Sequence, residues 1–349
     1  MTSVTPKRHL EFYFEDGKVV FELRPVPNNS NNEPDSETAP VLYRLHPGLL
    51  VRRSELCRDL LSLPRPENAP SQIQSEGCVD SNPIIIANAC TKFEMDTLLT
   101  YWYSGETDYP QTEVFLIALL KMSRLFICGD GLAFAKKELE HRALAWDPDT
   151  DEPKDPEAAA EPARGLHPAL QLHLAQLYFI NEWLDPAFRR LLSLSLNRLS
   201  AHQFQSLGPN GMYWLTQTKT KIAEVRATIA FTSPALIQSD DCSGTWARCR
   251  LAWEQEWAGS VRQMIHHPNQ IFPLTHILTE LGKVSIDNLC YHCHRDTMAS
   301  LETDPLFNSE EDFVKVAIEA LHGNQTDTHI RKAVCQIKTG AGLEDTQTT

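Results

Sequence analysis

The stretch that decides the fold runs from Leu42 to Glu106. It reads LYRLHPGLLVRRSELCRDLLSLP over residues 42–64 and NPIIIANACTKFEMDTLLTYWYSGE over residues 82–106, with a polar segment between the two. A short apolar run leads into His46, and an amphipathic stretch of helical character follows it. The β-branched run Ile84-Ile85-Ile86 then predicts a buried strand, and the residues after it predict a helix. Strands and helices in this order favour an α+β domain.

Local signals divide this stretch into elements. Residues 47–63 place leucines along approximately one helix face, and Ser54 with Glu55 predicts a break into two short helices. Thr91 can cap the later helix, with Glu94 at the capping-box position. We expect that helix to bury four large side chains, namely Phe93, Leu98, Tyr101 and Trp102.

The N-terminal region predicts a small sheet. His9–Phe14 and Lys18–Leu23 are two β-rich runs joined by Glu15-Asp16-Gly17, and Asp-Gly between apolar runs is a strong hairpin signal. Val41–Leu45 reads as the third strand of the meander. The polar residues on either side, 25–40 and 64–83, predict loops.

These residues together resemble a BTB/POZ domain. The matching pieces are Phe12–Leu23, Tyr43–His46, Leu49–Leu63, Pro83–Ile86, Phe93–Gly105 and Val114–Leu144. The chain looks most similar to the BTB-domain proteins of mushroom-forming fungi, whose openings resemble Tyr13–Leu23. The resemblance implies a small sheet flanked by helices, and it implies that His46 has a packing and hydrogen-bonding role.

The same resemblance implies a function. A BTB/POZ domain binds or assembles other proteins, so we expect a non-enzymatic adaptor with protein partners. Two settings follow from the family: substrate recruitment to a cullin-type ubiquitin-ligase scaffold, or corepressor-type transcriptional regulation. A homodimer through the helices near residues 47–63 is a further expectation.

Composition predicts the domain layout. Residues 1–8 are expected to form a tail and residues 9–146 the BTB/POZ domain. The segment 147–165 holds seven acidic residues and four prolines, which is typical of a linker. Residues 166–338 predict a mainly α-helical C-terminal domain, with helices over 167–184, 186–199, 200–207, 212–231, 243–264 and 309–321. Residues 339–349 predict a disordered tail.

Charge and hydropathy narrow the class of partner. The 349 residues carry a net charge of −14, with 46 acidic against 32 basic residues, so direct binding to nucleic acid is disfavoured. The apolar runs are too short to span a bilayer, and the N-terminus shows no secretory signal. We therefore expect a cytoplasmic or nuclear protein without membrane contact, whose nine cysteines are thiols or metal ligands.

The C-terminal cysteines are the strongest chemical candidate. Cys242-x6-Cys249 is followed about forty residues later by Cys290-x2-Cys293. Two thiolates two residues apart form half of a common structural zinc site, and a second pair can complete the tetrahedron. The fungal look-alikes have a similar arrangement. These four residues are our predicted metal ligands.

A competing interpretation stays open for Cys249. It shares one predicted helix face with Trp246, Trp253 and Trp257, and a cysteine on such a stripe is often a small core residue. The sulfur positions discriminate the two. Zinc ligation requires the four sulfurs within ~4 Å of one another, whereas plain packing does not.

Two other function classes remain as alternatives. A zinc-dependent regulator could contact nucleic acid through the C-terminal cysteines, although the acidic charge opposes this. An enzyme could use the same cysteines or His292 and His294, but no phosphate loop, nucleophile elbow or H-E-x-x-H motif occurs. We interpret His266-His267-Pro268 and Gly129-Asp130-Gly131 as turns, and Cys57 and Cys90 as core residues.

Overall fold

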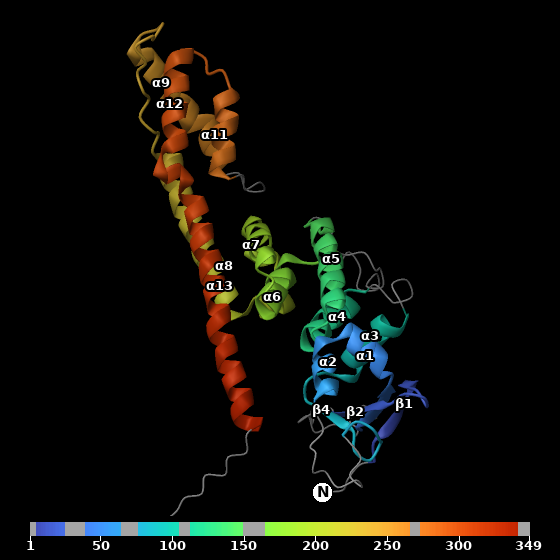
Figure 1. The fold of residues 1–349 in the computed structure, drawn as a ribbon. Coiled ribbons are helices and arrows are strands. Elements are labelled where there is room, and N and C mark those ends of the chain that lie inside the picture. Colours follow the sequence, from blue (N-terminus) through green and yellow to red (C-terminus); the bar gives the residue numbers. More distant parts are fainter. Residues whose placement is uncertain are drawn as a thin grey trace, which may run out of the picture. The chain divides into compact units, whose positions relative to one another are not determined.

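The structure is a computed structural model that describes residues 5–24, 39–63, 76–104, 112–148, 165–265 and 273–340, with side chains as far as residue 323. The chain divides into two compact units, residues 1–166 and 167–349 (Figure 1). The first holds a small sheet with helices, and the described part of the second is helical. The predicted α/β mixture is confirmed at this level. Most of the expected loops and of the linker at 147–165 lie outside the described residues.

Four strands form the sheet of the first unit. They are β1 (Lys7–Tyr13), β2 (Val19–Arg24), β3 (Val41–Leu45) and β4 (Ile84–Ala87). Their order across the sheet is β1-β3-β2-β4. β3 runs parallel to β1 and antiparallel to β2, and β4 runs parallel to β2. The strand expected to be buried, β4, instead lies at the edge of the sheet, and Ile85 is 44% exposed.

The predicted hairpin between the first two strands is wrong. A turn does form, because the Gly17 amide donates to the Phe14 carbonyl at 3.1 Å, but its two sides pair with β3 instead of each other. The Phe14 amide donates to the Arg44 carbonyl and the Lys18 amide to the Leu45 carbonyl. A Cβ on Gly17 would stand 2.9 Å from the Arg44 oxygen, so this close crossing requires glycine. The turn thus takes the chain from β1, on one side of β3, to β2 on the other side.

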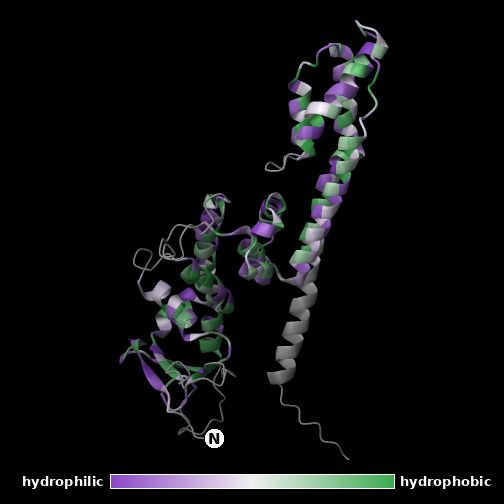
Figure 2. Cartoon of the chain, turned by 180° about the vertical axis from the view of Figure 1, so that it is seen from behind, coloured by the Kyte–Doolittle hydropathy of each residue, from purple (hydrophilic) through white to green (hydrophobic). Residues whose placement is uncertain are grey.

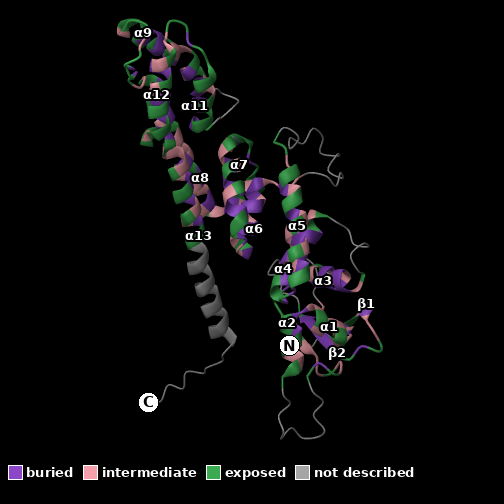
Figure 3. Ribbon diagram, turned by 45° about the horizontal axis from the view of Figure 1, so that its top comes forward, coloured by how far each residue is buried: buried purple, intermediate pink, exposed green. Residues whose placement is uncertain are grey.

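Five helices complete the described part of the first unit. They are α1 (Pro47–Arg53), α2 (Glu55–Ser62), α3 (Lys92–Ser104), α4 (Glu113–Leu125) and α5 (Gly129–Ala145). The predicted break is confirmed, since Ser54 separates α1 from α2 and its hydroxyl accepts from the Cys57 amide at 3.0 Å. The capping box of α3 is confirmed by reciprocal bonds between Thr91 and Glu94. Buried residues gather along α3 and α4 (Figure 3).

Two details of these helices differ from the sequence prediction. Phe93 is 51% exposed, whereas Leu98, Tyr101 and Trp102 are buried as expected. Successive side chains of an α-helix are rotated by about 100°, so Phe93 lies on a different face of α3 from the buried side chains and Met95. The residues 129–131, expected as a turn, instead form the first turn of α5.

The described part of the second unit consists of helices. The α-helices are α6 (Pro168–Tyr178), α7 (Leu184–Ser193), α8 (Ala201–Phe231), α9 (Trp246–Glu256), α10 (Arg262–Ile265), α11 (Leu274–Lys283), α12 (Tyr291–Thr303) and α13 (Pro305–Gly340). Short 3-10 turns lie at Asn181–Trp183 and Leu196–Arg198, and a π-helical turn lies at Trp257–Val261. α8 and α13 lie side by side (Figure 1).

Several predicted boundaries in this unit need correction. The helix expected over 167–184 ends at Tyr178, because Phe179 adopts a left-handed conformation (φ 55°). The two helices expected on either side of residue 208 are confirmed, because Gly208 (φ 64°, ψ 173°) is not helical and, with Pro209 after it, divides α8 into two helical stretches. α13 continues to Gly340, so residues 339 and 340 are helical, and the rest of the predicted tail lies outside the described residues.

Hydropathy along the long helices is mixed. Figure 2 shows hydrophilic and hydrophobic residues interleaved along α8 and the coloured part of α13. Among the described residues no helix is both long and apolar enough to cross a membrane.

Candidate metal centre

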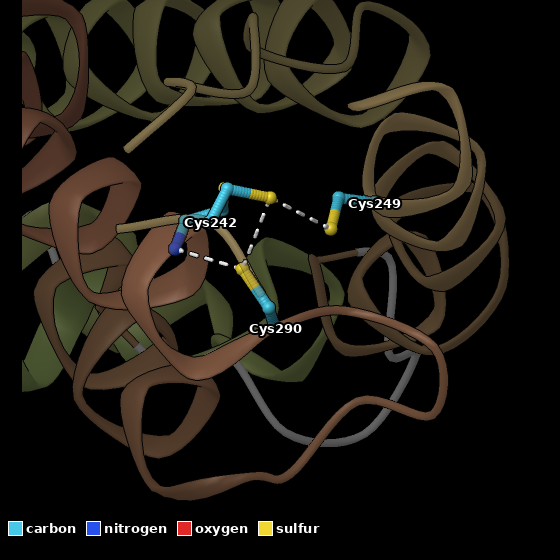
Figure 4. Close-up of side chains that lie close together, drawn as sticks. Cys242, Cys249 and Cys290 are labelled. Atoms are coloured by element: carbon cyan, nitrogen blue, oxygen red, sulfur yellow. Dashed lines mark hydrogen bonds between the residues drawn. The ribbon is translucent and has the colours of Figure 1, made fainter. Parts of the chain in front are cut away.

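Four cysteines from three segments converge in the second unit. Cys242 lies between α8 and α9, Cys249 lies on α9, Cys290 caps α12, and Cys293 lies in its first turn. The four sulfurs all lie within 4.8 Å of one another. Figure 4 shows the sulfurs of Cys242, Cys249 and Cys290 facing each other. The Cys242 sulfur is 3.9 Å from that of Cys249 and 3.7 Å from that of Cys290.

The two separations of 3.9 and 3.7 Å match the edges of a metal tetrahedron, whereas the four-sulfur cluster as a whole, at up to 4.8 Å, is wider than the ~4 Å expected around zinc. Four sulfurs at ~2.3 Å from a central zinc ion are about 3.8 Å apart. A disulfide would instead require a separation of about 2.05 Å, and every cysteine with a described side chain is a free thiol. The four free thiols therefore lie within metal-binding distance of one another.

Backbone amides point at two of the sulfurs. The Cys293 amide donates to the Cys290 sulfur at 3.4 Å, and the Ser239 amide donates to the Cys293 sulfur at 3.4 Å. The first bond belongs to the N-terminus of α12, where the helix dipole also favours negative charge. Such donors stabilise thiolates, which is the protonation state that binds metal.

The thiols differ in acidity. Burial tends to raise the pKa of Cys290, but hydrogen bonds from the Cys293 backbone and from the neighbouring cysteine side chains bring this pKa down to about 7. Burial raises the pKa of Cys293 to about 12, and burial also raises the pKa of Cys249. Deprotonating a second or third of these thiols would place several negative charges close together. A bound metal ion would supply the positive charge that offsets them.

The segment that carries Cys242 is anchored by neighbouring helices. The Ile237 amide donates to the Thr297 hydroxyl of α12 at 2.9 Å, and the Trp253 indole of α9 donates to the Pro234 carbonyl at 2.8 Å. A turn bond from the Cys242 amide to Ser239 then aims the cysteine at the other three. The fold therefore brings the four sulfurs together through contacts outside the sulfur cluster.

The competing core interpretation of Cys249 is also satisfied. Cys249, Trp253 and Trp257 are at most 2% exposed and belong to one apolar cluster, against which Trp246 packs half-buried. The sulfur nevertheless lies within 4.8 Å of the other three. Packing among tryptophans and membership of the sulfur cluster are thus compatible.

The interleaved histidines do not belong to the sulfur cluster. The metal-sized group contains cysteines and neither His292 nor His294. His294 is buried with its ring centroid 6.3 Å from that of Trp253, and burial lowers its pKa. The predicted turn at residues 266–268 lies outside the described residues.

The first unit contains a histidine–aspartate pair that sequence reasoning missed. His9 Nε2 lies 3.2 Å from an Asp96 carboxylate oxygen, and Asp96 also accepts from the Tyr43 hydroxyl at 2.9 Å. The other ring nitrogen, Nδ1, accepts from the Glu11 and Phe12 amides, which places the proton on Nε2. With its lone pair occupied by the backbone, His9 is arranged to support the sheet and not to abstract a proton.

His46 and the two core cysteines behave as predicted. The His46 ring lies 4.7 Å from that of Phe14, and its two nitrogens meet Tyr103 and Asp16. Cys57 and Cys90 are buried. These residues stabilise the first unit.

Comparison of the chain with protein-family models, with curated proteins and with solved structures found no match.

Proposed function

We propose that this chain is a non-enzymatic protein-interaction adaptor whose helical unit is held by a structural zinc ion on Cys242, Cys249, Cys290 and Cys293. The observation that carries the proposal is the convergence of four sulfurs within 4.8 Å. Four protein ligands fill a tetrahedral coordination shell, so no position remains for water or substrate. A site of this kind stabilises a fold and does not catalyse a reaction.

Zinc suits this donor set best. Soft thiolates in tetrahedral S₄ geometry select zinc or iron over magnesium or calcium, which prefer oxygen. Zinc has no redox chemistry, which suits a site embedded in a tryptophan-rich core.

The adaptor role rests on the first unit. We propose that residues 9–146 form a BTB/POZ domain, and the support is the sequence resemblance together with the element order. Two strands, a third strand before His46, a helix pair, a fourth strand and three further helices follow one another in the expected sequence.

An exposed apolar surface lies where α2 meets the connection between α4 and α5. Leu56 is 37% exposed, Leu125 is 39% exposed and Ile127 is 50% exposed. The Glu55 amide donates to the Ile127 carbonyl at 3.2 Å, which joins the two segments. We propose that these three side chains contribute to a protein-contact surface.

Backbone strain at Ile127 supports the same surface. Its φ of 51° is left-handed, which is unfavourable for a β-branched residue. The conformation is held by the bond from its own amide to Arg124 and by the Cys128 amide on the Ser123 carbonyl at 2.7 Å. Strain of this kind gathers at functional positions.

The proposed role implies a class of partner and a cellular compartment. A cullin-type ubiquitin-ligase scaffold or a corepressor-type assembly is the proposed partner class, with action in the cytoplasm or nucleus. We also propose a homodimer through residues 47–63. The net charge of −14 opposes direct contact with nucleic acid.

Affinity purification of the tagged chain from its own cells tests the adaptor role. A Leu56→Asp/Ile127→Asp variant should lose a stoichiometric protein partner that the wild type retains. Leu144→Asp is the matched control, because Leu144 is a 69% exposed apolar residue elsewhere in the unit. Equal recovery by all three proteins, or capture only of DNA in a salt-dependent manner, would refute the proposal. Light scattering at micromolar concentration tests the dimer, and a strict monomer would reject it.

A further inference from the structure

A pocket of about 690 Å³ lies in the second unit, and none of the four clustered cysteines lines it. It is lined by residues of α7, α8 and α13, with Ile265, Pro273 and Thr275. Small-molecule sites typically measure about 300–1,000 Å³, so the pocket has the size of a ligand site. Nothing in the proposed adaptor or zinc role uses it.

Apolar side chains make up much of its wall. Leu192 comes from α7, Ile222 from α8, and Phe307 with Val314 from α13. Phe307 and Val314 are at most 4% exposed, so they are held by the core. These side chains suit the hydrocarbon part of a ligand.

Most of the charge in the lining is already paired. Arg226 donates to Glu310, whose second oxygen accepts from the Leu274 amide at 3.0 Å. Arg189 is shared between Glu311, which lines the pocket, and Asp185. These groups compensate one another.

Lys219 is different. Its Nζ donates to the carbonyl oxygens of Leu192 and Leu194, at 2.6 Å each, at the C-terminal end of α7. An ammonium group has three N–H donors, so one donor remains beyond these two bonds. Among the described residues, no carboxylate lies close enough to Lys219 to form an ion pair with it. Its positive charge therefore has no anionic partner there.

The structure assigns this pocket to a small amphipathic carboxylate, with the carboxylate on the third N–H of Lys219 and the hydrocarbon chain along Ile222, Phe307 and Val314. Charge complementarity favours an anion on this ammonium group. Burial lowers the pKa of Lys219 to about 8, and a bound carboxylate would raise that pKa again.

Calorimetric titration of the full chain with decanoate, octanoate and decan-1-ol tests this site. We expect one saturable decanoate site per chain, weaker octanoate binding by up to roughly fourfold per methylene, and much weaker binding of the alcohol. No saturable decanoate binding, or equal affinity for the alcohol, would overturn the proposal.

Variants locate the site. Lys219→Met keeps the apolar stem and removes the charge, and it should weaken decanoate at least tenfold. Lys221→Met is the matched control on the same helix, because Lys221 is exposed and lies over the Phe313 ring. Because Lys219 also holds the end of α7, an independent variant is needed. Ala223→Trp reduces the pocket volume from an exposed position one helical turn after Lys219, and it keeps the lysine itself.

Undiminished binding by a folded Lys219→Met protein, or by Ala223→Trp, would place the ligand elsewhere and sink the assignment. Zinc content and partner recovery should be the same in all three variants. A failure here is therefore distinguishable from a failure of the adaptor or zinc proposals.

Discussion

Removing the proposed zinc ion should destabilise the helical unit by a measurable amount. The sharpest perturbation is Cys293→Ala, because Cys293 is fully buried and its sulfur is one of the four that converge. Chelation of the wild-type protein should produce the same loss without any mutation. The two perturbations together separate the contribution of the metal from that of the side chain.

The magnitude follows from linkage. At a free zinc concentration about 1,000 times the dissociation constant, binding stabilises the folded state by about 4 kcal/mol. The unit spans residues 167–349. For a domain of that size each kcal/mol shifts Tm by about 2–4 °C, so chelation should lower the Tm of this unit by about 8–16 °C. Loss of the buried sulfur itself adds about 1 kcal/mol in Cys293→Ala.

Calorimetry with and without chelator measures the shift, and hydrogen exchange of peptides from α9 and α12 assigns it to this unit. Cys293→Ala should start at a lower Tm and respond little to chelator. Cys90→Ala is the matched control, because Cys90 is a buried cysteine of the first unit. It should keep the full response.

Two results would refute this reasoning. One is a wild-type Tm that changes by less than about 2 °C on chelation. The other is a chelator response in Cys293→Ala as large as in the wild type, which would place the metal elsewhere.

Two further predictions concern the first unit. In a denaturant titration, Gly131→Ala should destabilise this unit by about 1–3 kcal/mol, because a Cβ there would stand 2.4 Å from the Ser123 hydroxyl. Gly129→Ala is the control and should be neutral or stabilising, because a Cβ at that position meets nothing within 4 Å. Burial tends to raise the pKa of Asp80, but hydrogen bonds from Tyr13 and Arg8 outweigh burial and lower this pKa. The Asp80 carboxylate therefore stabilises the folded state fully above its unfolded pKa of about 3.9. This stability is lost as the pH falls through the lower pKa of the folded state. Asp80→Asn should therefore flatten the acid limb of the stability profile, and an unchanged profile would contradict the assignment.

Local signals in the sequence predicted local structure well. The Ser54 break and the Thr91 cap depend on hydrogen bonds that span three residues, so the sequence pattern contains both partners. The Cys290-x2-Cys293 pair is similar, because the helix N-terminus itself turns both sulfurs toward one point. Convergence with Cys242 and Cys249 was a hypothesis from spacing, and the structure brings all four together.

Features that depend on tertiary pairing were missed. The Asp16-Gly17 signal does mark a turn, but whether β1 pairs with β2 is decided by β3, which enters later in the chain. His9 and Asp96 are 87 residues apart and carry no motif. Lys219 looks like any helical lysine in the sequence, and its setting arises only when α7, α8 and α13 pack around the pocket.

Zinc K-edge X-ray absorption of the purified protein tests the central claim most directly, since it reports both the presence of the metal and its ligands. The account predicts one zinc ion per chain with four sulfur neighbours at about 2.3 Å. A protein without bound metal, or a first shell in which nitrogen or oxygen replaces the sulfurs, would contradict it.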